Sequence, residues 1–236
     1  MTTLLTLERW NQFWSFYKEE PHQKTAIKTL YDQIQKADPQ ILTEEALWRQ
    51  QFSNAPSLPT PPSTSNPLLV PHQSQLDNAS GQGARECFSS SCAMVAMYYG
   101  KVKNDDEYNK VRAKYGDTTN NQAQVKALQS LGLKAEFKTT GTTQDLENLI
   151  RQGRPIPVGW LHHGPVSAPR GTGHWSVIIG FTSSHWIHND PNGEANMVNG
   201  GYTNHNNGKA ISYSRLNWDR RWRVNGTGGW YLDVSK

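Results

Sequence analysis

Two cysteines, Cys87 and Cys92, are the side chains best suited to covalent chemistry in this chain of 236 residues. Cys87 lies where a polar, glycine-containing loop meets an apolar run that predicts a helix. A thiol in the first turn of a helix feels unpaired backbone N–H groups and the positive end of the helix dipole, which favour the thiolate. Because the thiolate is the form that attacks a carbonyl carbon, we predict that Cys87 is a nucleophile. Cys92 lies inside the apolar run, which predicts a small buried side chain.

A nucleophilic thiol needs an imidazole partner, and among 8 histidines His174 has the best position. It follows glycines that leave the backbone room, and it begins an apolar run typical of a buried strand. The next predicted strand ends at Asn189 and Asp190. If residues 182–184 form a hairpin turn, His174 and Asp190 lie at the same end of two adjacent strands, where a carboxylate can orient the imidazole. Asn189 is the alternative for this third position.

A side-chain amide upstream of the nucleophile can complete an oxyanion hole together with the backbone N–H of Cys87. Such donors contribute about 2.7–4 kcal/mol to transition-state stabilisation. We predict Gln75 in this role, with Gln73 and Gln82 as competitors.

The other histidines carry weaker signals. His162 and His163 precede a Gly-Pro pair in a loop, where they either line a cleft or belong to the surface. His185 and His188 alternate on the strand after His174, which predicts half-buried rings with satisfied nitrogens. No catalytic signal accompanies His72 or His205.

The sequence predicts neither a metal site nor a cofactor. Two cysteines five positions apart match no zinc pattern. Asp190, Asn192 and Glu194 resemble the opening of a calcium loop, but the glycine at its sixth position and the glutamate at its twelfth are missing. Neither a phosphate-cradling glycine-rich loop nor a Gly-x-Ser-x-Gly elbow is present.

The order of predicted elements indicates an α+β protein with helices first and an antiparallel sheet second. Apolar spacing and glycine stops predict helices over 87–99, 104–114, 120–131 and from Thr142 to about Gly153. Strands are predicted over 156–160, 175–181, 186–189 and 229–234. These elements belong to one domain, residues 69–236. Residues 1–52 predict a small helical module, and the uncharged, proline-rich segment 53–68 predicts a linker.

Charge and targeting signals narrow the function classes. The net charge is +4, and a tryptophan-interleaved arginine cluster at 215–223 could bind a polyanion. No nucleic-acid-binding motif accompanies it, so we predict a solvated rim whose tryptophans complete a core. The N-terminus lacks a secretory signal and no segment has the length of a membrane span. Together with two free thiols, this predicts a protein made in a cytoplasm that needs no membrane.

Five blocks of sequence, in order, resemble the C39-like cysteine peptidases: VPHQSQLDN (70–78), ECFSSSCAMVAMYYG (86–100), PIPVGW (155–160), GHWSVIIG (173–180) and NDPNG (189–193). The resemblance implies a papain-like fold, in which the nucleophile helix packs against an antiparallel sheet. It also implies Cys87 as nucleophile, His174 as base, Asp190 as the orienting acid and Gln75 in the oxyanion hole. The best-known C39 members are fused to transporters and cut leader peptides after a double glycine. This chain lacks a membrane segment, so that role is not expected.

Three functions fit these observations. The first is a peptidoglycan hydrolase of the phage endolysin type that cuts amide bonds in the stem peptide, with the helical module as a wall-binding element or a scaffold. It would be made without a signal peptide and act on the cell wall. The second is a cytoplasmic cysteine protease that processes proteins or peptides. The third is a catalytically silent binding or effector module, which the presence of Cys87, His174 and Asp190 disfavours.

Overall fold

The computed structural model describes residues 66–236. The helices are α4 (Cys87–Tyr98), α5 (Asp105–Arg112), α6 (Asn121–Ser130), α7 (Thr143–Arg151) and α8 (Arg215–Trp222). Short 3-10 turns are η2 (Gln75–Asp77), η3 (Gly83–Arg85) and η4 (Val224–Gly226). The strands are β1 (Lys134–Lys138), β2 (Ile156–Trp160), β3 (His174–Phe181), β4 (His185–Asn189), β5 (Glu194–Ala195), β6 (Tyr202–Asn204), β7 (Ile211–Ser214) and β8 (Trp230–Ser235).

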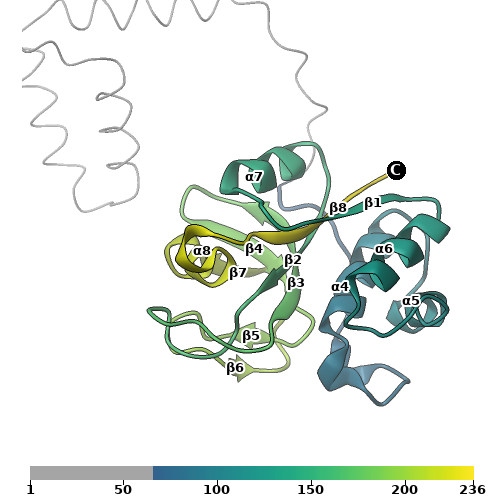
Figure 1. Ribbon diagram of the computed structural model, residues 1–236, viewed down its shortest axis with the longest axis horizontal. Coiled ribbons are helices and arrows are strands. Elements are labelled where there is room, and N and C mark those ends of the chain that lie inside the picture. The colour runs from purple at the N-terminus through teal and green to yellow at the C-terminus, as the bar shows by residue number, and fades with distance from the viewer. Residues whose placement is uncertain (1–65) are drawn as a thin grey trace, which may run out of the picture. The chain divides into compact units, whose positions relative to one another are not determined.

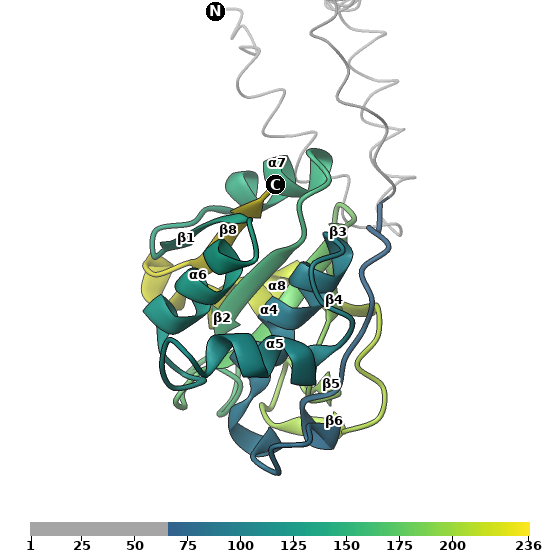
Figure 2. The ribbon, with the colours of Figure 1, turned by 90° about the vertical axis from the view of Figure 1, so that its right-hand side faces the viewer.

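A six-stranded sheet in the order β1-β8-β2-β3-β4-β7 forms the centre of the domain, and all its neighbouring strands are antiparallel. Helices α4, α5 and α6 lie on one side of this sheet and α8 lies on the other (Figure 1). The view from the α4 side shows α8 behind the strands (Figure 2). The predicted α+β, papain-like arrangement, with the nucleophile helix packed on an antiparallel sheet, is therefore confirmed.

Helix α4 is fixed on the sheet by an aromatic stack next to Cys87. The ring of Phe88 lies parallel to that of Trp175 in β3, with centroids 3.6 Å apart and an interplanar angle of 5°. Buried aromatic pairs of this kind add about 0.5–1.5 kcal/mol beyond the area they bury. The helix ends at Tyr98, and Gly100 two residues further on has a φ of 70° that is readily adopted only by glycine. The position of Cys87 is thus set by its neighbour's packing and not by its own side chain.

The predicted helices and strands occur in the structure, but their layout is not helices first and sheet second. Strand β1 lies between α6 and α7 in sequence and pairs with β8 at the edge of the sheet. Its sequence, Lys-Ala-Glu-Phe-Lys, has three charged residues and only two apolar ones, so it does not stand out as a strand. Helix α7 begins at Thr143, and Thr142, the predicted start, is its N-cap, because the Thr142 and Asp145 side chains form a reciprocal capping box.

The prediction of a solvated rim for the arginine cluster at 215–223 is correct only in part. Trp218 and Trp222 do complete the core, with 0% and 3% of their surface exposed. Arg221, however, is also 0% exposed. Its guanidinium donates hydrogen bonds to the carbonyl oxygens of Leu161, His163, Gly164 and Met197. Burial of a charge is tolerated because these acceptors replace water.

Residues just before position 69 also pack against the described residues. Asn66 bonds both backbone groups of Phe181, and Leu68 is 3% exposed in the core. The predicted helical module over 1–52 and most of the 53–68 linker lie outside the described residues and stay predictions. Across residues 66–236, none of the helices combines the length and the apolar character that a bilayer crossing requires.

Candidate active site

Cys87 and His174, predicted as nucleophile and base, lie together where α4 and β3 begin. Cys87 is the first residue of α4, and no side chain caps that end of the helix. His174 is the first residue of β3. The Cys87 thiol is within hydrogen-bonding reach of the His174 imidazole. The partly exposed Cys87 can therefore meet a substrate, whereas Cys92 is fully buried and burial raises the pKa of its thiol.

Asp190 is the partner on the other side of the imidazole. A tight turn joins β3 to β4, since the backbone N–H of Thr182 donates to the carbonyl of His185. Asp190 follows β4 directly, and its Oδ1 lies 2.8 Å from Nε2 of His174. Nε2 is thereby occupied, which leaves Nδ1 for the Cys87 thiol. The imidazole is held between thiol and carboxylate, as an imidazole that shuttles protons requires.

The Asp190 carboxylate is 0% exposed and accepts hydrogen bonds on both oxygens. Oδ1 also accepts from the backbone N–H of Asn192 at 2.9 Å. Oδ2 accepts from the Tyr213 hydroxyl at 3.1 Å, and the Tyr202 hydroxyl lies 3.4 Å from Oδ1. All of these groups are donors, so the carboxylate is fixed in position and compensated for its burial.

The surroundings of His174 favour its charged form. Burial alone would lower the pKa of His174, but the charge and hydrogen bond of Asp190, together with contact to Cys87, raise it to about 10. The rings of Trp160 and Tyr202 lie nearly perpendicular to the imidazole, at 86° and 79°, with centroids 5.3 and 5.6 Å away. At neutral pH His174 can therefore be an imidazolium beside the Cys87 sulfur, and an adjacent positive charge favours a cysteine nucleophile.

Asn189, the alternative to Asp190, has a different task. Its Nδ2 donates to the carbonyl of Val70 at 3.0 Å, and its Oδ1 accepts from the backbone N–H of Ala210 at 3.0 Å. Asn189 thus fastens two peripheral segments to the end of β4. Of these two side chains, Asp190 is the one that contacts the His174 imidazole, so it stays the predicted third residue.

Gln75 is buried against the turn that leads to Cys87. It is 3% exposed, and its Nε2 donates to the carbonyl of Gly83 at 2.8 Å. One N–H of the amide is left over for another acceptor. The competitors are placed otherwise: Gln73 bonds the carbonyl of its neighbour His72 and the backbone N–H of Asp105, and Gln82 is exposed. Gln75 remains the predicted oxyanion donor.

Some residues at the site gave no signal, or an ambiguous one, in the sequence. His162, left open between cleft and surface, has its ring centroid 5.6 Å from that of His174. Burial, with smaller effects of His174 and His163, lowers the pKa of His162 to about 4. The Nε2 of His72 contacts the carbonyl oxygen of Asp190 at 3.0 Å. This contact joins residues far apart in the chain, and no local pattern announces it.

The prediction for His188 was wrong. It is 0% exposed, not half-buried, and only Nδ1 has a partner, the Ser176 hydroxyl at 2.9 Å. The cause is α8, whose Trp218 ring covers this face of β4 with its centroid 5.0 Å from that of His188. Burial lowers the pKa of His188 to about 3, so the ring is a neutral part of the core.

Two open grooves adjoin the site. One, of about 500 Å³, includes His205, whose ring stacks on Tyr202 at 5.4 Å. The other, of about 460 Å³, includes His163, whose ring lies 3.9 Å from that of His162. Tyr202 and His162 each lie 5.6 Å from the His174 ring. Within residues 66–236, no three His, Cys, Asp or Glu side chains could together hold a metal ion.

Comparison with known proteins gives the family. Residues 64–207 match the family described as papain-like cysteine protease AvrRpt2. The chain belongs to this family and is a cysteine peptidase.

Solved structures share the fold at low sequence identity. A protein described as a C39-like peptidase from Bacillus anthracis has a TM-score of 0.51 and 16% identity, over 71% of this chain and 95% of that one. The double glycine motif protease of an AMS/PCAT transporter, solved with a leader peptide, has a TM-score of 0.47 and 21% identity, over 72% and 94%. The peptidase domain of Streptococcus ComA has a TM-score of 0.44 and 18% identity, over 64% and 92%. At these identities the likeness concerns the fold alone. No curated protein matches the chain.

Proposed function

We propose that this peptidase cleaves peptide bonds in protein or peptide substrates through Cys87, His174 and Asp190. The observation that carries the proposal is the placement of one imidazole between a thiol and a buried carboxylate. A cysteine paired in this way is an activated nucleophile. Membership in a family of papain-like cysteine proteases supports the same reaction class.

In the proposed reaction, the Cys87 thiolate attacks the carbonyl carbon of the scissile bond, and the carbonyl oxygen becomes an oxyanion. The backbone N–H of Cys87 and the amide of Gln75 donate to it. As the C–N bond breaks, His174 gives its proton to the leaving amine, and a thioester remains. A water molecule then attacks the thioester carbonyl while His174 takes a proton from that water. The C–S bond breaks, which releases the carboxyl product and restores the thiolate–imidazolium pair.

An unfolded, fluorescently labelled protein is the substrate that tests this proposal. We expect Cys87→Ser to lower kcat by at least about 10³-fold, because removal of a nucleophile leaves only binding and oxyanion stabilisation. Cys92→Ala is the matched control, since the Cys92 thiol is buried, and it should retain activity close to that of the wild type. Hydrolysis by Cys87→Ser at the wild-type rate would contradict the proposed role of Cys87 as nucleophile.

The stem peptide of peptidoglycan is a second candidate substrate. Its support is charge: residues 69–236 carry 18 Lys and Arg against 13 Asp and Glu, which suits an anionic wall polymer. Purified bacterial cell walls separate the candidates. Clearing of walls by the wild type but not by Cys87→Ser, with no cleavage of the unfolded protein, favours the wall substrate. The opposite pattern favours the processing protease.

The silent binding module is tested with a thiol reagent. It predicts that Cys87 reacts no faster than free cysteine. The proposed peptidase predicts faster labelling, which His174 promotes.

A further inference from the structure

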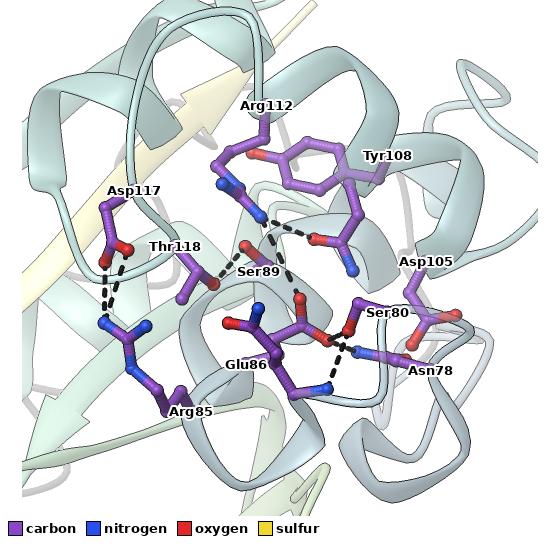
Figure 3. Close-up of polar contacts among 12 residues, drawn as sticks. Asn78, Ser80, Arg85, Glu86, Ser89, Asp105, Tyr108, Arg112, Asp117 and Thr118 are labelled. Atoms are coloured by element: carbon purple, nitrogen blue, oxygen red, sulfur yellow. Dashed lines mark hydrogen bonds and ion pairs between the residues drawn. The ribbon is translucent and has the colours of Figure 1, made fainter.

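The residue directly before the nucleophile is a buried glutamate. Glu86 is 3% exposed and occupies the N-cap position of α4, yet its side chain makes no capping hydrogen bond to that helix. Its carboxylate is directed instead toward the loop that precedes the helix (Figure 3). A carboxylate so deeply buried is costly unless its oxygens are bonded, so its partners indicate its task.

The partners of Glu86 come from two directions. Its Oε2 accepts hydrogen bonds from Asn78 Nδ2 at 2.6 Å and from the Ser80 hydroxyl at 2.8 Å. Its Oε1 faces the guanidinium of Arg112 in α5 at 3.9 Å. Figure 3 shows these groups around the carboxylate, whereas the adjacent Arg85 points away to Asp117. Glu86 therefore ties the 78–80 segment and α5 to the start of the nucleophile helix.

The segment tied by Glu86 is continuous with the predicted oxyanion donor. Gln75 begins η2, the chain passes through residues 78–80, and it returns through η3 to Cys87. Gly83 closes this loop: its carbonyl accepts from both Gln75 Nε2 and the backbone N–H of Glu86. A Cβ at Gly83 would lie 2.2 Å from the backbone oxygen of Gln75, so the two segments of the loop pack directly against each other.

We propose that Glu86 is a positioning residue that fixes the amide of Gln75 relative to the backbone N–H of Cys87, and so shapes the oxyanion hole. It acts through the hydrogen bonds to Asn78 and Ser80. The proposal rests on the proposed peptidase function. Its effect is confined to steps in which an oxyanion develops, because the neighbouring Arg112 compensates the charge of Glu86.

Glu86→Gln tests this role because it preserves size but leaves one acceptor oxygen where the carboxylate has two. The new NH₂ group faces either the donors Asn78 and Ser80 or the guanidinium of Arg112, and it can accept from neither. We expect kcat for peptide hydrolysis to fall about 10²-fold, as for loss of one oxyanion donor, with KM changed less than about twofold. Alkylation of Cys87 by iodoacetamide should stay within about twofold of the wild type. That displacement forms a C–S bond as iodide leaves and develops no oxyanion.

Two further variants make the test specific. Arg85→Gln changes the adjacent residue, whose side chain is 53% exposed, and should leave both rates unchanged. Ser80→Ala removes a single donor to Glu86 and should show a smaller loss of kcat, again without loss of alkylation. It keeps the proposal testable if Glu86→Gln does not fold.

The double variant Gln75→Ala, Glu86→Gln asks whether Glu86 acts through Gln75. If it does, the second substitution adds less than about threefold to the effect of the first, because the two share one function. Full additivity, an equal fall in hydrolysis and alkylation, or wild-type hydrolysis in Glu86→Gln would overturn the role of Glu86. Absence of Cys87-dependent hydrolysis in the wild type would instead overturn the proposed function.

Discussion

Asp190 and Glu86 are both buried carboxylates next to the reactive pair, but they face different kinds of partner. Asp190 accepts from the imidazole of His174, a group that changes its charge during the proposed reaction. Glu86 accepts from an amide and a hydroxyl, which stay neutral, and its counter-charge on Arg112 lies 3.9 Å away. A carboxylate bonded to a titratable group sets where a proton resides. One bonded to neutral donors sets where the backbone lies.

The largest effect that sharpens this contrast is expected from Asp190→Asn. The imidazolium of His174 then loses its counter-charge, and the neutral imidazole formed during the reaction loses the carboxylate that fixes its tautomer, so kcat should fall about 10³–10⁴-fold. Alkylation of Cys87 at pH 6 should fall as well, since less thiolate forms, whereas Glu86→Gln should spare it. Steady-state kinetics and timed labelling with peptide mass spectrometry measure both. Equal losses of kcat and of alkylation in Asp190→Asn and Glu86→Gln would contradict the distinction between the two carboxylates.

A smaller effect is expected from Tyr213→Phe. This change removes the donor to Asp190 Oδ2 and the acceptor for the backbone N–H of Ala195. We expect a loss of about 1–3 kcal/mol in the free energy of unfolding, because two buried polar groups lose a partner. The loss of kcat should be about tenfold and accompanied by a similar loss in alkylation. Chemical denaturation measures the free energy of unfolding. An unchanged value would contradict the role of Tyr213 as hydrogen-bond partner of Asp190 and Ala195.

The stability of the fold should carry the signature of His174 as pH rises. An unfolded histidine titrates near pH 6.5, whereas Asp190 and Cys87 outweigh burial and raise the pKa of His174 to about 10 in the folded protein. Between these values the folded state binds the extra proton, so this stabilisation is complete below about pH 6.5 and is lost as pH rises toward 10.

The variant His174→Gln lacks the titrating imidazole, so comparison with the wild type isolates the contribution of His174 to the free energy of unfolding. The difference in unfolding free energy between wild type and variant should shrink by more than about 1 kcal/mol from pH 7 to 10, since one pKa unit corresponds to about 1.4 kcal/mol. A difference that stays constant over this window would show that His174 does not gain a proton on folding.

The smallest effect is expected from the exposed pair next to Glu86. Arg85 and Asp117 form an ion pair 3.1 Å apart with side chains 53% and 50% exposed. Exposed pairs of this kind contribute about 0–1 kcal/mol, so Arg85→Gln should change the unfolding free energy by less than that and leave catalysis alone. A loss of hydrolysis in this variant would mean that the whole 85–86 segment, and not the buried carboxylate, governs the site.

The sequence allowed prediction where a site residue coincides with a local signal. Cys87 begins a helix, His174 begins a buried strand and Asp190 directly follows the next one, so element boundaries predicted that these three side chains lie together. Tyr202 and Tyr213 reach Asp190 from β6 and β7, which are 3 and 4 residues long. Strands this short have no usable periodicity. The position of α8 behind the sheet likewise decided the burial of His188 and Arg221, and such tertiary packing is not encoded in any short pattern.

The direct test of the account is the rate at which iodoacetamide labels Cys87 at pH 6, in the wild type and in His174→Gln. Free cysteine is mostly protonated at this pH, so it serves as the reference. Contact between the two side chains predicts labelling at least about tenfold faster than free cysteine in the wild type, and a return toward the free rate in the variant. Labelling of wild-type Cys87 at the free-cysteine rate, unchanged by loss of the imidazole, would contradict it.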